Sequence, residues 1–217
     1  MTRFIGAAVC GGLLMFLLLT GSPARALDAA TAGAFVERLM QDAVGELAGK
    51  PLSREERAGV LAGLLDRYAD TKTTANELLG RHLANTSPDD QARFQTTFVA
   101  YILASWTDYL ADMSPGQKLV VTQVEPEADR LRVHTLASTP GEDPMPVDWS
   151  VGTTPDGRPY VADVAMGGVG IVRMMRADFT SVLFANRGRV DGLIAALQKK
   201  IEFAAATRHA EAPPAGR

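Results

Sequence analysis

An α+β fold is predicted from two changes in the hydrophobic periodicity of the chain. Apolar residues recur every three or four positions through the first half, alternate with polar residues between about 119 and 165, and return to the helical spacing from 171 to 202. A period near 3.6 is typical of an amphipathic helix, and a period of 2 is typical of a strand with one buried face. We therefore expect N-terminal helices, a four-stranded antiparallel meander and two C-terminal helices, all in one domain over residues 27–206.

The N-terminal helices are predicted from their apolar stripes and from the residues that begin them. The first stripe consists of Phe35, Leu39, Ala43 and Leu47. Ser53-Arg54-Glu55-Glu56 has the pattern of a capping box, which begins a second helix. A shorter helix is expected over about 74–83. Ser87-Pro88 begins a long helix to about Asp112, because serine caps a helix and proline fits its first position.

The sheet is predicted from four alternating segments, at 119–124, 131–135, 147–151 and 160–165. Short connections such as Pro155-Asp156-Gly157 favour antiparallel neighbours. A glycine turn then leads into a helix over 171–185, Asn186-Arg187-Gly188 ends that helix, and a last helix covers 190–202. Residues 207–217 are expected to form a disordered tail.

Residues 1–26 have the layout of a secretory signal peptide. Arg3 supplies the positive start, residues 4–19 are apolar, and Ala24-Arg25-Ala26 is a cleavage motif before Leu27. An uncleaved anchor is the alternative, but the apolar run is shorter than the ~20 residues that a spanning helix needs. Cleavage would remove Cys10, so the mature chain would contain no cysteine and no thiol nucleophile.

The charge of the mature chain argues against some classes of partner. Removing Arg3 and Arg25 from the 22 basic residues leaves 20 against 25 acidic residues, a net charge of −5. Nucleic-acid binding requires a basic face, so we expect no nucleic-acid partner. Overall charge also disfavours docking on anionic lipid as the main mode of action, although local basic patches are compatible with this composition.

No catalytic or metal-binding constellation is found, so we expect neither an enzyme nor a bound metal or cofactor. His82, His134 and His209 have no metal-ligand residue at the required spacing, and a G-x-S-x-G motif is absent. The pairs Asp89-Asp90 and Glu55-Glu56 lie in first helical turns, where negative charge stabilises a helix end.

Two features have both a structural and a ligand-binding interpretation. Gly167-Gly168-Val169-Gly170 is either a tight strand-to-helix turn or a phosphate cradle on helix-end amides. The turn is favoured because no lysine follows and Arg173 stands where a dinucleotide motif needs a third glycine. The methionines Met174-Met175 and an aromatic stripe on the long helix suit either a core or an adaptable apolar site. The stripe consists of Phe94, Phe98, Tyr101 and Tyr109.

The C-terminal third contains an ordered set of motifs. Asp163-Val164 with Gly168-Val169 is similar to a D-V-x-x-x-G-V-S turn, with Gly170 in place of serine. Residues 175–179 are similar to a Y-R-x-Q-F segment, 188–200 resemble a characteristic last helix, and Gln91-Ala92-Arg93-Phe94 fits a central helix upstream. In these motifs the chain resembles the MlaC family of periplasmic phospholipid-binding proteins, also called the toluene-tolerance family, over about 35–203.

This resemblance implies a periplasmic lipid carrier that has no enzymatic step. Its cavity would lie between sheet and helices, with the headgroup near Arg176. The residues expected to line it are Phe98, Tyr101, Ile102, Trp149, Val151, Val161, Val164, Val169, Ile171, Met175, Phe179 and Leu183. The implied partners are an inner-membrane ABC transporter with its substrate-binding subunit and an outer-membrane lipoprotein complex.

Other hypotheses stay open. One branch of the family is associated with hopanoid biosynthesis, so a hopanoid-type lipid is an alternative cargo to phospholipid. A lipid-free interaction module of an envelope complex would have a filled core and an exposed apolar patch. A hydrolase is the least favoured, because no catalytic group is found.

Overall fold

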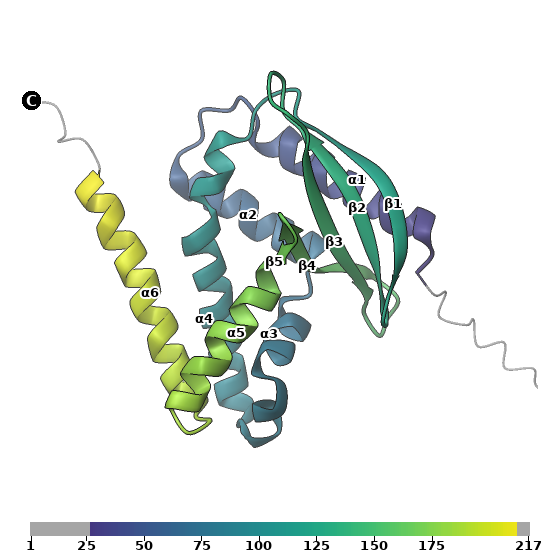
Figure 1. Ribbon diagram of the computed structural model, residues 1–217. Coiled ribbons are helices and arrows are strands. Elements are labelled where there is room, and N and C mark those ends of the chain that lie inside the picture. The colour runs from purple at the N-terminus through teal and green to yellow at the C-terminus, as the bar shows by residue number, and fades with distance from the viewer. Residues whose placement is uncertain (1–26, 212–217) are drawn as a thin grey trace, which may run out of the picture.

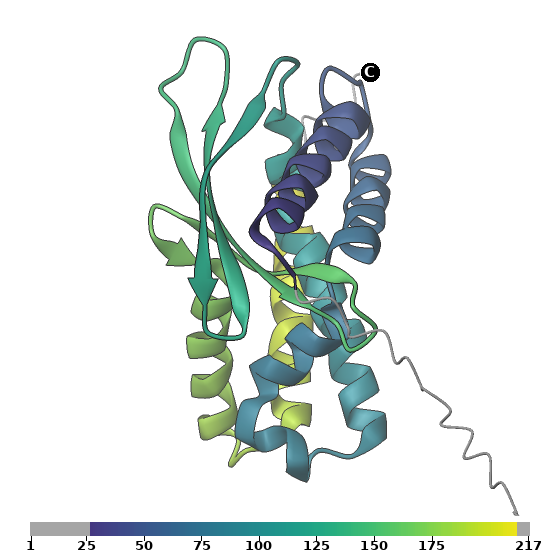
Figure 2. The same ribbon diagram turned by 90° about the vertical axis from the view of Figure 1, so that its right-hand side faces the viewer.

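The computed structural model describes residues 27–211, and the predicted signal peptide and residues 212–217 lie outside the described residues. Figure 1 shows a twisted antiparallel sheet beside a set of helices, and Figure 2 shows the first helix lying against one side of that sheet. The order of elements confirms the predicted α+β class: helices, then the sheet, then two helices.

The N-terminal half is helical. Its elements are α1 (Ala29–Leu47), α2 (Arg54–Tyr68), α3 (Thr71–Leu79), the 3-10 helix η1 (Gly80–Asn85), α4 (Pro88–Trp106) and the 3-10 helix η2 (Asp108–Asp112). The predicted capping box is confirmed, because the Glu56 amide donates to Ser53 Oγ at 3.1 Å and the Ser53 amide donates to Glu56 Oε2 at 2.7 Å. Ser87 caps α4 in the predicted position, since the Asp90 amide donates to its Oγ at 3.1 Å.

Two predicted helix boundaries in this half were wrong. The short helix begins at Thr71 instead of near 74, because Asp70 is its cap and accepts from the Thr73 amide at 2.9 Å. The long helix was expected to reach Asp112, yet α4 ends at Trp106 and the chain continues as η2. At that junction Thr107 Oγ1 donates to the Leu103 carbonyl at 2.6 Å, a side-chain bond of the kind that competes with the regular ladder.

The sheet is a meander in the order β1-β2-β3-β4-β5 with every neighbour antiparallel. Its strands are β1 (Lys118–Glu127), β2 (Arg130–Ser138), β3 (Met145–Thr153), β4 (Pro159–Met166) and β5 (Val169–Gly170). Five strands replace the predicted four, because Gly167 and Gly168 both have positive φ and turn the chain back into a two-residue pairing with β4. The glycine segment is therefore a tight hairpin turn.

The chain ends in α5 (Ile171–Ala185) and α6 (Val190–Glu211). The bounds of α5 are as predicted. The second helix was expected to end at Glu202, and it continues into the stretch predicted as a disordered tail. Residues 203–206 read Phe-Ala-Ala-Ala and no glycine or proline follows before Pro213, so nothing in the sequence stops the helix earlier.

Three apolar clusters hold these layers together. A helical cluster joins α3, α4, α5 and α6 and is centred on Phe94 and Phe179. A sheet cluster joins α1 to the inner face of the sheet through Val36, Val133 and Trp149. A third, smaller cluster joins α1 to α2. The alternation along β2 and β3 thus buries one face of the sheet, as the period of 2 predicted.

Candidate functional site

Seven of the predicted lining residues lie in or against the helical cluster. They are Phe98, Met175, Phe179 and Leu183, which are buried, and Tyr101, Ile102 and Ile171, which are partly buried. Phe179 packs edge-on against Phe94 and tilted against Tyr101, in both cases with ring centroids 6.2 Å apart. Aromatic pairs at such separations prefer these arrangements over a face-to-face stack. Phe94, Phe98 and Tyr101 of the predicted stripe therefore belong to a packed interior shared with α5. Tyr109 does not, because it lies in η2 and is 71% exposed.

Four other lining residues belong to the sheet cluster. They are the buried Trp149 and Val151 and the partly buried Val161 and Val164. The indole Nε1 of Trp149 donates to Thr135 Oγ1 at 3.1 Å, and that hydroxyl donates to the Val147 carbonyl at 2.6 Å. Both polar side chains are buried, so this chain of two hydrogen bonds fixes the orientation of the Trp149 ring on the inner face.

The structure thus divides the predicted lining into a helical group and a sheet group. Val169 belongs to neither, since it lies in β5 with 58% of its surface exposed. The residues that are only partly buried, such as Ile102 and Val164, lie at the margins of the two clusters. Their role as the lining of a lipid cavity remains a prediction.

Arg176 lies in a charged cluster that ties the sheet to the helices. Its Nη2 is 3.6 Å from Glu77 Oε2, and its side chain is 54% exposed. Glu77 of α3 also pairs with Arg130 of β2, whose guanidinium stands 6.0 Å from the centroid of the Tyr160 ring. Both arginines therefore share the Glu77 carboxylate, and the charge of Asp129 also acts on Arg130. Sequence reasoning missed Glu77 and Arg130, because they come from elements about 50 residues apart with no shared motif.

The start of α5 is capped by a carboxylate from the preceding strand. Asp163 Oδ1 accepts from the amides of Val164 and Val172, both at 2.8 Å, and Oδ2 accepts from the Arg173 amide at 3.3 Å. A Cβ at Gly170 would lie 2.3 Å from Asp163 Oδ2, so this position must be glycine for the carboxylate to sit there. The helix-end amides that a phosphate would use are already occupied, which supports the turn interpretation over the phosphate cradle.

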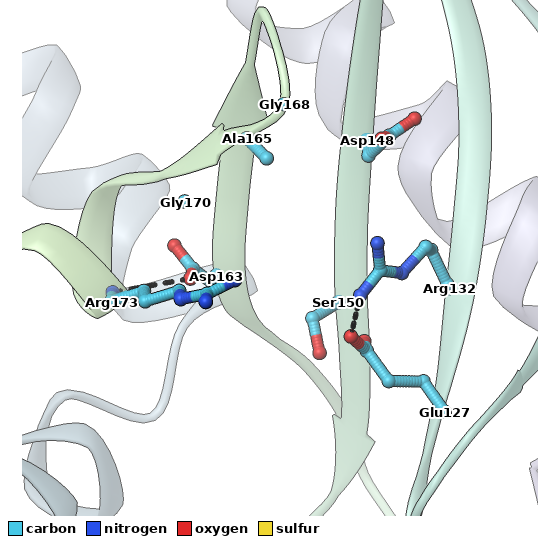
Figure 3. A pocket seen from close by; sticks show the side chains of 9 residues that line it. All are labelled: Glu127, Arg132, Asp148, Ser150, Asp163, Ala165, Gly168, Gly170 and Arg173. Carbon is cyan, nitrogen blue, oxygen red and sulfur yellow. Dashed lines mark hydrogen bonds and ion pairs between the residues drawn. The ribbon is translucent and has the colours of Figure 1, made fainter.

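A small polar pocket of about 120 Å³ lies on the outer face of the sheet (Figure 3). Its lining is Glu127, Arg132, Asp148, Ser150, Asp163, Ala165, Gly168, Gly170 and Arg173. Glu127 and Arg132 form an ion pair on one side of it. The mixture of both charge signs and small residues gives this pocket no apolar wall, so it does not suit an acyl chain.

His134 stands beside that pocket on the same face. Its Nδ1 is 2.8 Å from Asp148 Oδ1 and its Nε2 is 3.2 Å from Glu125 Oε1. Burial lowers the pKa of His134, but the hydrogen bonds and charges of Asp148 and Glu125 outweigh it and raise the pKa above 6.5. Among residues 27–211 no group of three or more histidine, cysteine or acidic side chains is placed to hold a metal ion.

The architecture is that of a small α+β protein whose helices cover one face of an antiparallel sheet. The chain belongs to the MlaC protein family, whose sequence profile matches residues 36–199. This finding confirms the resemblance predicted from the sequence.

A solved structure of the phospholipid-binding protein from Ralstonia solanacearum, in complex with a phospholipid, has the same fold. The two are 24% identical, with a TM-score of 0.69 over 80% of this chain and 98% of that one. Curated protein sequences gave no match. Within the part of the chain that the structure describes, every helix is too short or too polar to cross a membrane.

Proposed function

We propose that this protein is a periplasmic carrier that encloses the acyl chains of a phospholipid and moves it between the inner and outer membranes. The observation that carries the proposal is membership of the MlaC family over residues 36–199. The shared fold with a protein solved in complex with a phospholipid supports it. A chain of 16 carbons costs on the order of 12 kcal/mol to expose to water, at ~0.8 kcal/mol per methylene, so a carrier must enclose it.

The acyl chains would enter between the helical cluster and the sheet cluster. The helical side offers Tyr101, Ile102 and Ile171, and the sheet side offers Val161 and Val164. All five are partly buried apolar residues at cluster margins, so separating the clusters there breaks less packing than separation at their centres. Met175 is buried next to this margin, and its flexible thioether adapts to chains of different shape.

The headgroup would lie at the charged cluster of Arg176, Glu77 and Arg130. This group joins α5, α3 and β2, and its two guanidinium groups suit a phosphate. Arg176 is the more exposed of the two arginines, so it is the one free to turn toward a headgroup.

Membership of the family also supports a proposed wider role. Export through the predicted signal peptide would bring the chain to the periplasm. There it would serve an inner-membrane ABC transporter with its substrate-binding subunit, and an outer-membrane lipoprotein complex. The cycle needs binding and release only, so we propose no catalytic step and no cofactor.

The test is to express residues 27–217, purify the protein without detergent, and analyse extracted lipid by mass spectrometry. Stoichiometric phospholipid is expected. Val164→Trp adds bulk at the margin between the helical cluster and the sheet cluster. It should reduce the amount of bound lipid while the circular dichroism spectrum stays unchanged. Val120→Trp is the matched control, because Val120 is 54% exposed on β1. Full lipid occupancy in Val164→Trp and in an equivalent Ile102→Trp variant would contradict the proposal that acyl chains lie between the two clusters.

The same experiment separates the alternatives. If the extracted lipid is a stoichiometric hopanoid, the protein is still a lipid carrier, but its cargo is a hopanoid instead of a phospholipid. A protein that never contains lipid, yet binds an envelope complex tightly, would replace the carrier with a lipid-free interaction module.

A further inference from the structure

One end of the molecule is formed by η1 and by the turn between α5 and α6, which lie together at the bottom of both Figure 1 and Figure 2. Residues of both segments line an open hollow of about 480 Å³. Its lining consists of Arg81, His82, Asn85, Phe184, Arg187 and Gly188. We call this end of the molecule the arginine–phenylalanine tip.

The tip has a defined shape. The Gly188 amide donates to the Leu183 carbonyl at 2.7 Å, which ends α5 in a tight turn. Arg187 has φ 57°, a left-handed conformation that is uncommon for a residue with a side chain. A Cβ at Gly188 would lie 2.9 Å from His82 Nδ1, so the imidazole ring packs directly on the backbone of the turn. The two loops are therefore held against each other.

The tip also carries positive charge that the protein does not neutralise. Neither Arg81 nor Arg187 forms an ion pair with any residue in the described range 27–211, and no carboxylate lines the hollow. Arg81 instead donates weakly from Nε to His82 Nε2 at 3.5 Å. Arg189, just beyond the turn, does form an ion pair, with its Nη2 2.5 Å from Asp191 Oδ2.

An exposed aromatic ring lines the same hollow as these charges. Phe184 is 79% exposed in the last turn of α5. A ring that protrudes so far finds no apolar partner within the protein, and arginines beside it match the phosphates that surround a bilayer interface. The whole chain has a formal net charge of −3, so an anionic surface repels most of it and attracts this end.

We propose that the arginine–phenylalanine tip is a docking site for an anionic lipid bilayer. Phe184 enters the headgroup region, and Arg81 and Arg187 contact nearby lipid phosphates. Contact through one ring and two charges is weak and reversible. The inference concerns the outer surface of the protein and does not depend on any cargo inside it.

The test is flotation of purified protein with vesicles of phosphatidylcholine alone or with added phosphatidylglycerol. Binding is expected only to the anionic vesicles and should weaken as salt is raised. Arg81→Gln and Arg187→Gln should each weaken it roughly fivefold, as expected for one charge near an anionic surface. Phe184→Ser should also weaken it, and Phe184→Trp should give a blue-shifted emission with vesicles.

The chain offers matched controls for both kinds of residue. Phe203 is 74% exposed on α6, so Phe203→Ser should leave binding unchanged. The double substitution Arg189→Gln with Asp191→Asn removes a closed ion pair without changing the net charge, so it should also leave binding unchanged. Thermal denaturation confirms that each variant is folded. The proposal is overturned if the wild type does not bind anionic vesicles, or if the controls lose as much binding as the tip variants. Binding only to membranes that contain protein would also overturn it, and would assign the tip to an acidic protein partner. Lipid extraction from the same variants tests the carrier proposal separately, because their cargo should not change.

Discussion

Replacing Asp163 should release the start of α5 and measurably destabilise the fold. Asp163→Ala removes the acceptor for the amides of Val172 and Arg173. Loss of a side-chain cap costs about 1 kcal/mol, and loss of a negative charge at a helix start adds about 0.5 kcal/mol or more. The third bond, to the Val164 amide, brings the expected total to about 2 kcal/mol. In a domain of this size that lowers Tm by roughly 4–8 °C.

Gly170 provides an independent way to disturb the same contact. Because its Cβ would lie 2.3 Å from Asp163 Oδ2, Gly170→Ala should displace the carboxylate and lose much of the same stability. The two substitutions act on one interaction, so their effects should not add. In a protein that already carries Asp163→Ala, Gly170→Ala should cost little.

Urea denaturation followed by circular dichroism measures all four members of this cycle, and hydrogen exchange should show faster exchange of the Val172 and Arg173 amides. Asp66 is an exposed aspartate on α2, so Asp66→Ala is the control and should change stability by less than about 0.5 kcal/mol. If Asp163→Ala costs no more than Asp66→Ala, or if the effects of Asp163→Ala and Gly170→Ala simply add, the capping argument is wrong.

Two further predictions concern the two faces of the sheet. Thr135→Val leaves the buried Trp149 N–H without an acceptor, so it should lower the free energy of unfolding in denaturant by about 1–3 kcal/mol. Thr153→Val, at an exposed position, is the control and should change that free energy little. Equal effects of the two substitutions would contradict the role of the Thr135 hydroxyl. On the outer face, the raised pKa of His134 means that its ion pairs stabilise the fold fully below about pH 6.5 and that this contribution is lost as pH rises through the folded-state pKa. The stability difference between the wild type and His134→Gln should therefore be larger at about pH 5.5 than at about pH 8.5, and a difference that does not vary with pH would refute this assignment.

Features encoded by neighbouring residues were predictable from the sequence. The capping box at Ser53, the start of α4 at Ser87 and the alternation along β2 and β3 depend on residues within one turn or one strand. Their stereochemistry is local, so the pattern is sufficient. The family resemblance was predictable in the same way, from ordered motifs in the C-terminal third.

Features that depend on tertiary contacts were not predictable. Asp163 caps a helix that begins several residues later, across a hairpin turn, so the usual search for a cap immediately before the helix misses it. The pairing of Glu77 with Arg130 and Arg176 joins three elements that share no motif. The division of the candidate lining into two clusters likewise depends on how α1 and α4 pack, which hydrophobic periodicity does not specify.

The packing of α6 on α4 has a consequence for the order in which the protein can fold. The helical cluster combines Phe94 and Phe98 of α4 with Val190, Leu193, Ile194 and Leu197 of α6. A chain that emerges from its N-terminal end, from a ribosome or through a membrane pore, presents α4 long before α6. Until α6 has emerged, two phenylalanines lack the helix that covers them, and the interior cannot close. The last helix of the chain therefore completes the helical cluster, and the interior of the protein can close only after α6 has been made.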